Sequence, residues 1–382
     1  MRLKCPYLWM HQCIGTTATV HPCCVTYNND PQWRTITFEQ GINSPVHKKS
    51  RQEFTKGKFP LICKVCKDDE SNNIISHRQR ALVDFKDCDY KNVKIKYLDM
   101  KFTNTCNLSC RMCIPSSSSQ LEKLYSSVET FDMPHHIQRS NPHFKSNAQA
   151  EKKVQHTKKL ISEGLEILKV TGGEPFACKY FLEVVDWCID NDYAKNLEIK
   201  FTTNATKVNK KLLDKIKKFK KTTITVSIDG VEKIYNYIRH QADWKTFDKN
   251  IDLLNSYEEF TPLNISFCLQ FYNMLDVANY ANWCKSKDIE PYVDVHLKPF
   301  DSELDVKFAP KKMKLKLLQD AEEHGLENVS SYVKKFIEVE DIEKQKSLKR
   351  TTDIVDNLHN TDYKTSLYPE QVMFLSGEEL NN

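Results

Sequence analysis

The sequence predicts an α/β fold: a partial (β/α)6 TIM-like barrel with a small Cys-rich N-terminal module and a C-terminal helical extension. Strand-like and helix-like segments alternate from about residue 93 to 298. Repeated βα units imply a parallel sheet with right-handed crossovers. Two distinctive motifs directly follow strand ends, where barrel enzymes place their sites. We therefore divide the chain into a Cys-rich module (1–90), the barrel (91–300) and the extension (301–382).

The barrel elements follow from the spacing of apolar residues. Helical returns carry apolar residues at helical spacing, for example Trp244, Phe247, Ile251 and Leu254 at i, i+3, i+7 and i+10. Between the helical returns lie short runs rich in β-branched and aromatic residues, which are typical of strands. The predicted strands are 93–103, 165–170, 197–203, 223–228, 263–270 and 292–297.

Two stretches fall outside this βα pattern. An insertion at 114–163 begins with a serine run that predicts a capped helix, and a basic helix is expected near 148–162. The insertion is either a substrate lid or a plain surface excursion. Beyond the barrel, helices are predicted at 310–323 and 331–350, where they either close the barrel or bind a partner.

The most informative motif is a group of three cysteines after the first barrel strand. Cys106, Cys110 and Cys113 have the spacing C-x3-C-x2-C. Three thiolates on one short loop can hold three irons of a cubane cluster and leave the fourth iron open for a ligand. The alternative is a zinc knuckle, but structural zinc normally takes four protein ligands and this loop offers three.

A second motif follows the next strand. The run LEILKVTGGEP (165–175) is an apolar strand that leads into two glycines, a carboxylate and a proline. Gly172 and Gly173 allow a tight turn and a close approach to a ligand. Glu174 offers a carboxylate suited to an ammonium group, and Pro175 fits the entry to a helix. Alone, this run is also compatible with an ordinary strand-to-helix turn.

At these residues the chain resembles the radical S-adenosylmethionine (radical SAM) superfamily. The resemblance implies that the triad ligates a [4Fe-4S] cluster, and that Gly172, Gly173 and Glu174 hold the methionine amino group of SAM. It also implies that SAM binds the open iron. An electron from a reductant such as a flavodoxin or ferredoxin then cleaves SAM to methionine and a 5′-deoxyadenosyl radical, which abstracts a substrate hydrogen. The cofactor carries this chemistry, and the protein supplies orientation.

Later strand ends extend the resemblance. Thr202 and Asn204 match the family's turn after the third strand, with Ala205 where glycine is usual, and are expected to face SAM. A turn-forming Asn is the alternative for that residue.

The fourth strand end and the helix after it supply three further candidates. Ser227 and Asp229 match the family's Ser-x-Asp-Gly, near the SAM ribose or carboxylate, although Asp-Gly also suits a plain turn. Arg239 matches an arginine that pairs with the SAM carboxylate, for which a guanidinium is well suited. A surface arginine is the alternative.

The first ninety residues hold half of the 14 cysteines. The runs CPYLWMH (5–11), ATVHPCC (18–24) and CKVC (63–66) resemble twitch, which is half of the SPASM auxiliary-cluster arrangement, with Ala18 where glycine is usual. The resemblance implies a second [4Fe-4S] cluster, and Cys24 stays an alternative to Cys23 as ligand. Structural zinc is the other interpretation. The assigned ligands are Cys5, Cys23, Cys63 and Cys66.

Composition limits the remaining possibilities. No signal peptide is evident, so we expect a cytoplasmic protein whose cysteines bind metal rather than form disulfides. Four further cysteines at apolar barrel positions are expected to be buried thiols. The net charge of +5 is too small to indicate nucleic-acid binding, and no apolar run is long enough to span a membrane. The four expected buried thiols are Cys178, Cys188, Cys268 and Cys284.

Together these patterns predict a radical SAM enzyme that acts on a peptide or protein. The peptide substrate is expected because relatives with such auxiliary modules often modify peptides. Two alternatives stay open: a radical SAM enzyme acting on a small sugar-like or nucleotide-like molecule, and a non-catalytic scaffold that binds an iron–sulfur cluster or zinc.

Overall fold

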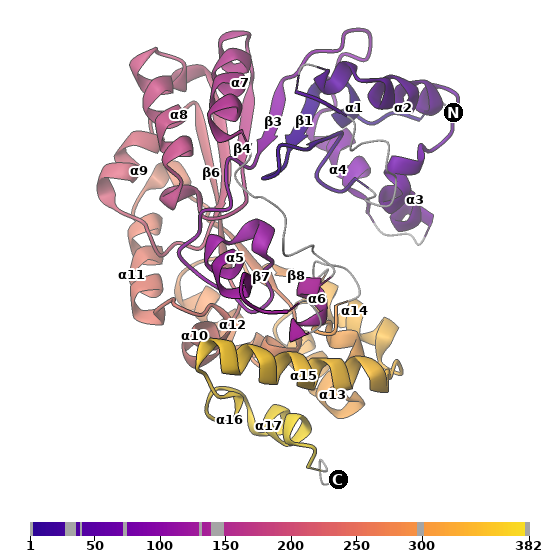
Figure 1. Cartoon of the computed structure of the whole chain (residues 1–382), viewed down its shortest axis with the longest axis vertical. Helices are drawn as coiled ribbons and strands as arrows, with labels where there is room; N and C mark the ends of the chain where they lie inside the picture. The colour runs from indigo at the N-terminus through magenta and orange to yellow at the C-terminus, as the bar shows by residue number, and fades with distance from the viewer. Residues whose placement is uncertain are drawn as a thin grey trace. The chain divides into compact units, whose positions relative to one another are not determined.

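A computed structural model describes residues 3–26, 36–38, 40–71, 75–129, 132–138, 149–295 and 302–378 (Figure 1). The chain forms two compact units. The first unit comprises Met1–Thr103, Lys145–Phe201 and Lys215–Thr222. The second comprises Asn104–Phe144, Thr202–Asp214 and Thr223–Asn382. Each unit is described below by itself.

The described strands form a mostly parallel eight-stranded sheet in the order β2-β1-β3-β4-β5-β6-β7-β8. Only the β1–β2 pair is antiparallel among the described pairings. All six predicted strands are present, so the α/β class is confirmed, while the barrel and the three-part division stay predictions. The strands are β1 (His11–Ile14), β2 (Val20–His21), β3 (Tyr97–Met100), β4 (Ile167–Val170), β5 (Glu198–Thr203), β6 (Lys221–Ile228), β7 (Asn264–Cys268) and β8 (Val293–Asp294).

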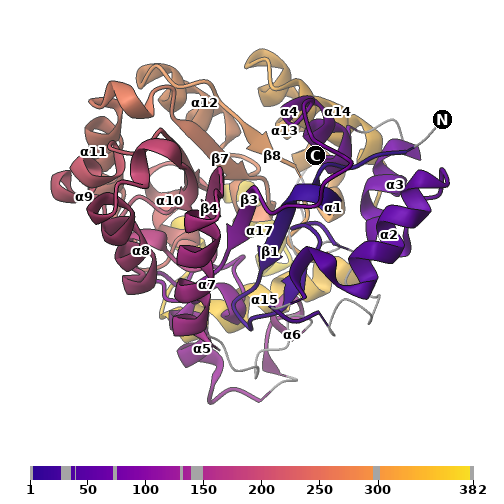
Figure 2. The ribbon, with the colours of Figure 1, turned by 90° about the horizontal axis from the view of Figure 1, so that it is seen from above.

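Two strands were not predicted, and both lie in the Cys-rich segment. β1 pairs in parallel with β3, His11 opposite Tyr97 and Cys13 opposite Asp99, and Figure 2 shows β1, β3 and β4 side by side. All four residues of β1 are buried, so the strand lacks the polar alternation of a half-exposed strand. β2 has only two residues. A strand this short, or buried on both faces, leaves no period-2 signal.

In the first unit, side-chain caps mark where two helices begin, α2 and α4. Ser44 accepts the His47 N–H at the start of α2, whose first residue is Pro45. Ser76 and Gln79 form a capping box on α4. The predicted basic helix is present as α7. The helices are α1 (Tyr7–Met10), α2 (Pro45–Thr55), α3 (Lys64–Ser71), α4 (His77–Asp84), α7 (Ala150–Ser162) and α8 (Lys179–Asp190).

The remaining helices include the predicted serine-capped one. Ser118 accepts the Leu121 N–H at the start of α5, so the capped helix is confirmed. The single helix predicted at 331–350 is wrong: the segment holds two helices, because Asp341 caps a new one by accepting the Lys344 N–H. These helices are α5 (Ser119–Tyr125), α6 (His135–Gln138), α9 (Lys210–Ile216), α10 (Glu232–Ile238), α11 (Trp244–Asn255), α12 (Val277–Ser286), α13 (Lys311–Glu323), α14 (Glu327–Phe336), α15 (Ile342–His359), α16 (Tyr363–Ser366) and α17 (Pro369–Ser376).

Burial along the strands separates a covered face of the sheet from a more open one. Buried and half-buried residues alternate along β5 and for most of β6 and β7. Cys178, Cys188 and Cys284 are buried thiols as predicted. The same prediction is wrong for Cys268, which is half-buried because it falls on the open face of β7.

No described helix combines the length and apolarity that a membrane crossing requires.

Candidate functional site

The triad loop lies in the second unit and is fastened by backbone hydrogen bonds. The N–H of Ser109 donates to the His240 carbonyl at 3.3 Å, and the N–H of Arg111 donates to the Ile238 carbonyl at 2.9 Å. The Ser118 hydroxyl donates to the Leu108 carbonyl at 2.6 Å. The C-terminal end of α10 with the residues that follow it, and the N-cap residue of α5, therefore hold the loop that carries the three thiols.

Hydrogen-bond donors lie close to two of the triad sulfurs. The Leu108 N–H nitrogen is 3.5 Å from Cys106 Sγ, and the Asn204 amide nitrogen is 4.0 Å from the same atom. Arg239 Nη1 is 3.9 Å from Cys110 Sγ. Donors at these positions stabilise negative charge on sulfur, which is the form that binds metal.

The environment of Cys110 fits a metal-bound thiolate. Burial raises the pKa of this thiol, which the nearby Arg239 charge lowers and the neighbouring Cys113 and Cys106 raise. The thiol alone therefore keeps its proton, and the positive charge of a metal centre is needed to displace it. Three clustered thiols with cationic and amide donors beside them suit a cluster held by three cysteines.

Arg239 and Asp229 form a buried ion pair beside the triad. Arg239 Nη2 lies 2.6 Å from Asp229 Oδ2, and the two side chains are 7% and 1% exposed. Asp229 also accepts the Cys268 N–H at 2.9 Å. Burial raises the pKa of Asp229, although Arg239 opposes this. Burial lowers the pKa of Arg239, but the nearby Asp229 and, more weakly, Cys110 raise it. The net effect is a raised pKa, so Arg239 stays charged. The surface-arginine alternative is wrong.

Asn204 combines a turn-forming role with contact to the triad loop. Its Oδ1 accepts the Thr206 N–H at 3.0 Å, an Asx-type turn. Its Nδ2 donates to Asn107 Oδ1 at 3.2 Å. Ala205 has a φ of +55°, so the backbone takes the left-handed conformation that glycine would supply. The missing glycine therefore leaves the turn itself intact.

Thr202 and Ser227 occupy half-buried positions at the C-terminal ends of β5 and β6. Both therefore project from the more open face of their strands. Within the described part of the chain neither side chain forms a hydrogen bond, and their contact with SAM stays a prediction.

The Gly-Gly-Glu segment belongs to the first unit. Gly172 and Gly173 both have positive φ, +80° and +60°. A Cβ on Gly172 would lie 3.0 Å from the Lys101 side chain, so the positive φ favours glycine at this position and the space for a larger residue is tight. Glu174 is 1% exposed, and its Oε1 accepts the Phe176 N–H at 3.0 Å. The carboxylate is thus held at the start of the 3-10 turn Pro175–Ala177.

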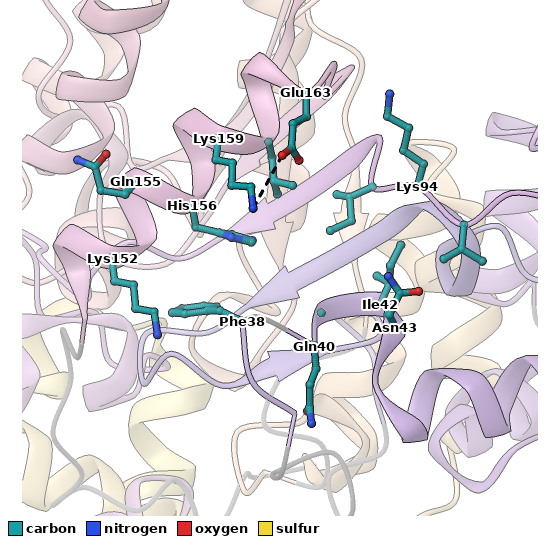
Figure 3. A pocket seen from close by; sticks show the side chains of 14 residues that line it. Phe38, Gln40, Ile42, Asn43, Lys94, Lys152, Gln155, His156, Lys159 and Glu163 are labelled. Atoms are coloured by element: carbon teal, nitrogen blue, oxygen red, sulfur yellow. Dashed lines mark ion pairs between the residues drawn. The ribbon is translucent and has the colours of Figure 1, made fainter.

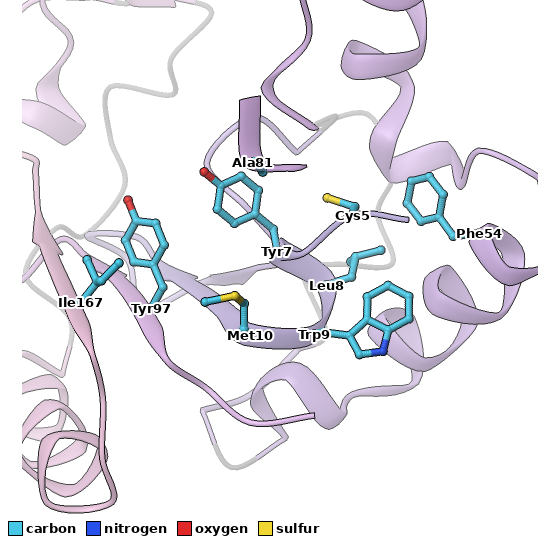
Figure 4. Close-up of a cluster of buried hydrophobic side chains, with 9 residues drawn as sticks. All are labelled: Cys5, Tyr7, Leu8, Trp9, Met10, Phe54, Ala81, Tyr97 and Ile167. Carbon is cyan, nitrogen blue, oxygen red and sulfur yellow. The ribbon is translucent and has the colours of Figure 1, made fainter. Parts of the chain in front are cut away.

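The four N-terminal cysteines lie together within the first unit. Cys5 belongs to a buried apolar cluster with Tyr7, Leu8 and Trp9 (Figure 4). Cys23 and Cys63 pack against that cluster. Burial raises the pKa of Cys5 to about 12, with a further contribution from Cys66. Burial likewise raises the pKa of Cys23, and nearby Cys24, Cys63, Cys5 and Cys66 raise it further.

Cys24, the alternative to Cys23, has a different environment. It is exposed, and its Sγ lies 3.4 Å from His77 Nε2. Ala18, where the resembled pattern has glycine, has a φ of +64° in the turn between β1 and β2. Among the described residues, no three His, Cys, Asp or Glu side chains stand as ligands around a single metal ion. In a four-iron cluster each thiolate binds a different iron, so its four sulfurs are spaced more widely than the ligands of one ion.

One residue of the triad loop was missed by the sequence reasoning. The Arg111 side chain is fully buried and forms an ion pair with Asp356 of α15. Its Nε donates to the Tyr237 carbonyl at 2.8 Å, and its guanidinium carbon lies 3.6 Å from the centroid of the Tyr237 ring. The available signal was an arginine placed between two cysteines of the triad, but nothing in the sequence indicates its partner.

Comparison with known families identifies a domain within the chain. Residues 100–265 match the Radical SAM superfamily. The matched segment contains the triad, the Gly-Gly-Glu run and the Asp229–Arg239 pair. The chain therefore contains a Radical SAM superfamily domain.

Individual relatives share this part of the chain. An uncharacterized protein of Methanocaldococcus jannaschii is 30% identical over 168 residues, which is 43% of this chain and 50% of that protein. GTP 3',8-cyclase of Campylobacter lari is 25% identical over 182 residues, 46% of each chain. The chain thus spans about half the length of these curated relatives.

Solved structures give a weaker likeness. Streptococcus suis SuiB bound to S-adenosylmethionine aligns with a TM-score of 0.40 and 14% identity, over 63% of this chain and 48% of that one.

Proposed function

We propose that this chain is a radical SAM enzyme whose [4Fe-4S] cluster is held by Cys106, Cys110 and Cys113, and that it abstracts a hydrogen atom from a peptide or protein. The observation that carries the proposal is the placement of Arg239 and Asn204 donors beside two of the triad sulfurs, 3.9 Å and 4.0 Å away. A solvent-exposed structural loop has no need of a buried cation next to a thiol. The match of residues 100–265 to the Radical SAM superfamily supports the same assignment.

The chain's own residues would bind and orient SAM. When bound, the cluster supplies the electron for reductive cleavage of SAM. Glu174 offers a carboxylate for the ammonium group of SAM, and Gly172 lets the backbone approach closely. The Arg239 Nε has no hydrogen-bond partner among the described residues, so we propose that it donates to the SAM carboxylate while Asp229 holds another nitrogen of the guanidinium. Thr202, Asn204 and Ser227 are proposed as further SAM contacts.

We propose a second cluster in the N-terminal segment. Two observations support this ligand set. Cys5, Cys63 and Cys66 lie close enough to Cys23 to raise its pKa, and Cys5 and Cys66 do the same for Cys63. The exposed Cys24 instead contacts His77. Structural zinc is the competing occupant. Cys63→Ala combined with Cys66→Ala is expected to remove roughly four irons per chain, measured by elemental analysis. Unchanged iron with lost zinc would favour the zinc site.

The substrate is the least constrained part of the proposal. A peptide or protein is favoured by the resemblance of the N-terminal cysteine runs to auxiliary modules of peptide-modifying enzymes. The similarity to GTP 3',8-cyclase favours a nucleotide-like small molecule as the second candidate, although this chain matches only 46% of that protein. A scaffold that binds metal without turnover is the third candidate.

The test is formation of 5′-deoxyadenosine by anaerobically reconstituted protein with SAM, using dithionite first and then a flavodoxin or ferredoxin. The comparison is the variant with all three triad cysteines changed to alanine. Product from the wild type alone is the expected result. Equal product from the triple variant would remove the triad from the mechanism. Stimulation by added peptides or by GTP then separates the two substrate classes.

A further inference from the structure

A pocket of about 510 Å³ lies in the first unit, and none of its lining residues belongs to the candidate site. Its lining residues come from three parts of the chain: Phe38 with residues 40–43, residues 93–95, and the stretch 152–163 on and just after α7 (Figure 3). Its volume is within the range of pockets that hold small ligands or a few peptide side chains.

The pocket has an aromatic and aliphatic lining. Phe38 is buried, and its ring stacks on His156 with centroids 5.5 Å apart and planes at 22°. Lys152 Nζ lies 5.3 Å from the centroid of the Phe38 ring. A lining of this kind accepts an apolar side chain. The aliphatic lining residues are Ile42, Val93, Ile95 and Leu160.

Among the described lining residues, lysines outnumber acidic side chains. Lys94, Lys152 and Lys159 line the pocket with Glu163 as the one described acidic residue. Glu163 lies 3.8 Å from Lys159, and both side chains are more than half exposed, so this pair neutralises the rim weakly. In Figure 3, Lys94 and Lys152 lie on opposite sides of the pocket. The charges therefore surround the apolar lining instead of converging on one point.

A buried donor without a partner stands behind one wall. Gln12 is fully buried, and its Nε2 has no hydrogen-bond partner among the residues that the structure describes, while its Oε1 lies 3.2 Å from His156 Nε2. Gly41, which also lines the pocket, lies beside that amide and has a φ of +48°. A Cβ at Gly41 would lie 3.3 Å from Gln12 Nε2. Because Gly41 has no side chain, only backbone atoms stand at this point between the pocket and the Gln12 Nε2 donor. This arrangement suits a ligand that places an acceptor oxygen there.

We propose that this pocket binds an acidic peptide segment that inserts one apolar side chain between flanking carboxylates. Separated ammonium groups match carboxylates spread along a peptide. A nucleotide fits less well, because the ammonium groups of Lys94 and Lys152 lie on opposite sides of the pocket and do not converge on one phosphate. If the bound peptide is the substrate, the role of this pocket rests on the proposed function. Binding of an acidic peptide by the pocket does not depend on that function.

Fluorescence anisotropy of a fluorescein-labelled peptide, Glu-Asp-Phe-Asp-Glu, on the full reconstituted chain tests the proposal. Lys152→Glu combined with Lys159→Glu is expected to weaken binding by about tenfold or more, and raised salt is expected to weaken binding to the wild type. The matched control is Lys48→Glu with Lys49→Glu, which makes the same charge change on exposed positions of α2. This control is expected to alter the affinity less than about twofold.

Two results would overturn the proposal. One is equal affinity of the pocket variant and the control variant. The other is displacement of the labelled peptide by ATP at concentrations where unlabelled peptide has no effect, which would assign the site to a small polyanion. The assay contains no SAM. Peptide binding without 5′-deoxyadenosine formation in the separate assay would therefore retain the pocket and reject the proposed function.

Discussion

Replacing Asp356 with asparagine is expected to loosen the triad loop. Arg111 sits between two of the triad cysteines, and its side chain is 0% exposed in the pair with Asp356, which is 9% exposed. Asp356 also accepts the Tyr363 N–H at 2.8 Å and the Thr361 hydroxyl at 2.7 Å. The substitution therefore leaves a buried guanidinium without its counter-ion and disturbs the chain beyond α15.

The size of the effect follows from burial. Breaking a buried ion pair by removing one charge typically costs about 3–5 kcal/mol. Asparagine keeps one acceptor oxygen, so we expect the lower end, about 3 kcal/mol. The control is Glu343→Gln on the same helix, because Glu343 pairs with Lys346 at 2.9 Å and both side chains are exposed, 83% and 69%. Its change is expected to stay within about 0.5 kcal/mol.

Urea unfolding followed by tryptophan fluorescence measures the stability change. A chelator challenge of the reconstituted protein measures how fast iron leaves the triad, and Asp356→Asn is expected to lose it faster than Glu343→Gln. Matching urea midpoints for the two variants would refute the reasoning. Lower stability with an unchanged rate of iron loss would show that the pair supports the fold without holding the triad loop.

Three further predictions follow from backbone conformation and from a buried imidazole. Gly172→Ala is expected to destabilise the protein by about 1–3 kcal/mol, because φ is +80° and the new Cβ would meet Lys101 at 3.0 Å; urea unfolding checks this, and an unchanged midpoint would contradict it. Ala205→Gly is expected to stabilise by up to about 1 kcal/mol in the same assay, because it removes a left-handed alanine; a lower midpoint would count against the strain. His359 stacks on His240, and burial lowers the pKa of His359 to about 3. The unfolded chain therefore binds the extra proton first, so stability falls as pH drops from about 6.5 toward 3. His359→Phe is expected to reduce that slope in urea titrations across this range, and an unaltered slope would refute the assignment.

The sequence predicted the parallel strands that obey a simple physical rule. Apolar residues recur at every second position along much of β5 and β6, and this period of two can be read from the sequence. The structure shows the matching alternation of buried and half-buried residues. The triad and the Gly-Gly-Glu run were also visible, because short-range spacing alone defines them. Gly172 and Gly173 both have the positive φ that their residue type suggests.

The parts that escaped prediction depend on tertiary contacts. β1 is buried throughout, so its neighbours in the sheet define it and its residue pattern does not. Cys268 has an apolar residue type but lies on the open face of β7, a distinction set by strand register. The pairing of Arg111 with Asp356 joins positions 245 residues apart, and no local pattern encodes such a contact.

That separation has a consequence for how the protein is made. Ribosomes add about 5–20 residues per second, so about 12–50 s pass between synthesis of Arg111 and synthesis of Asp356, 245 residues later. During this interval the emerging polypeptide carries the three thiols without their distal anchor. A carrier that delivers iron and sulfide to the nascent chain therefore meets an open loop, whereas one that acts after release meets a loop already clamped by α15.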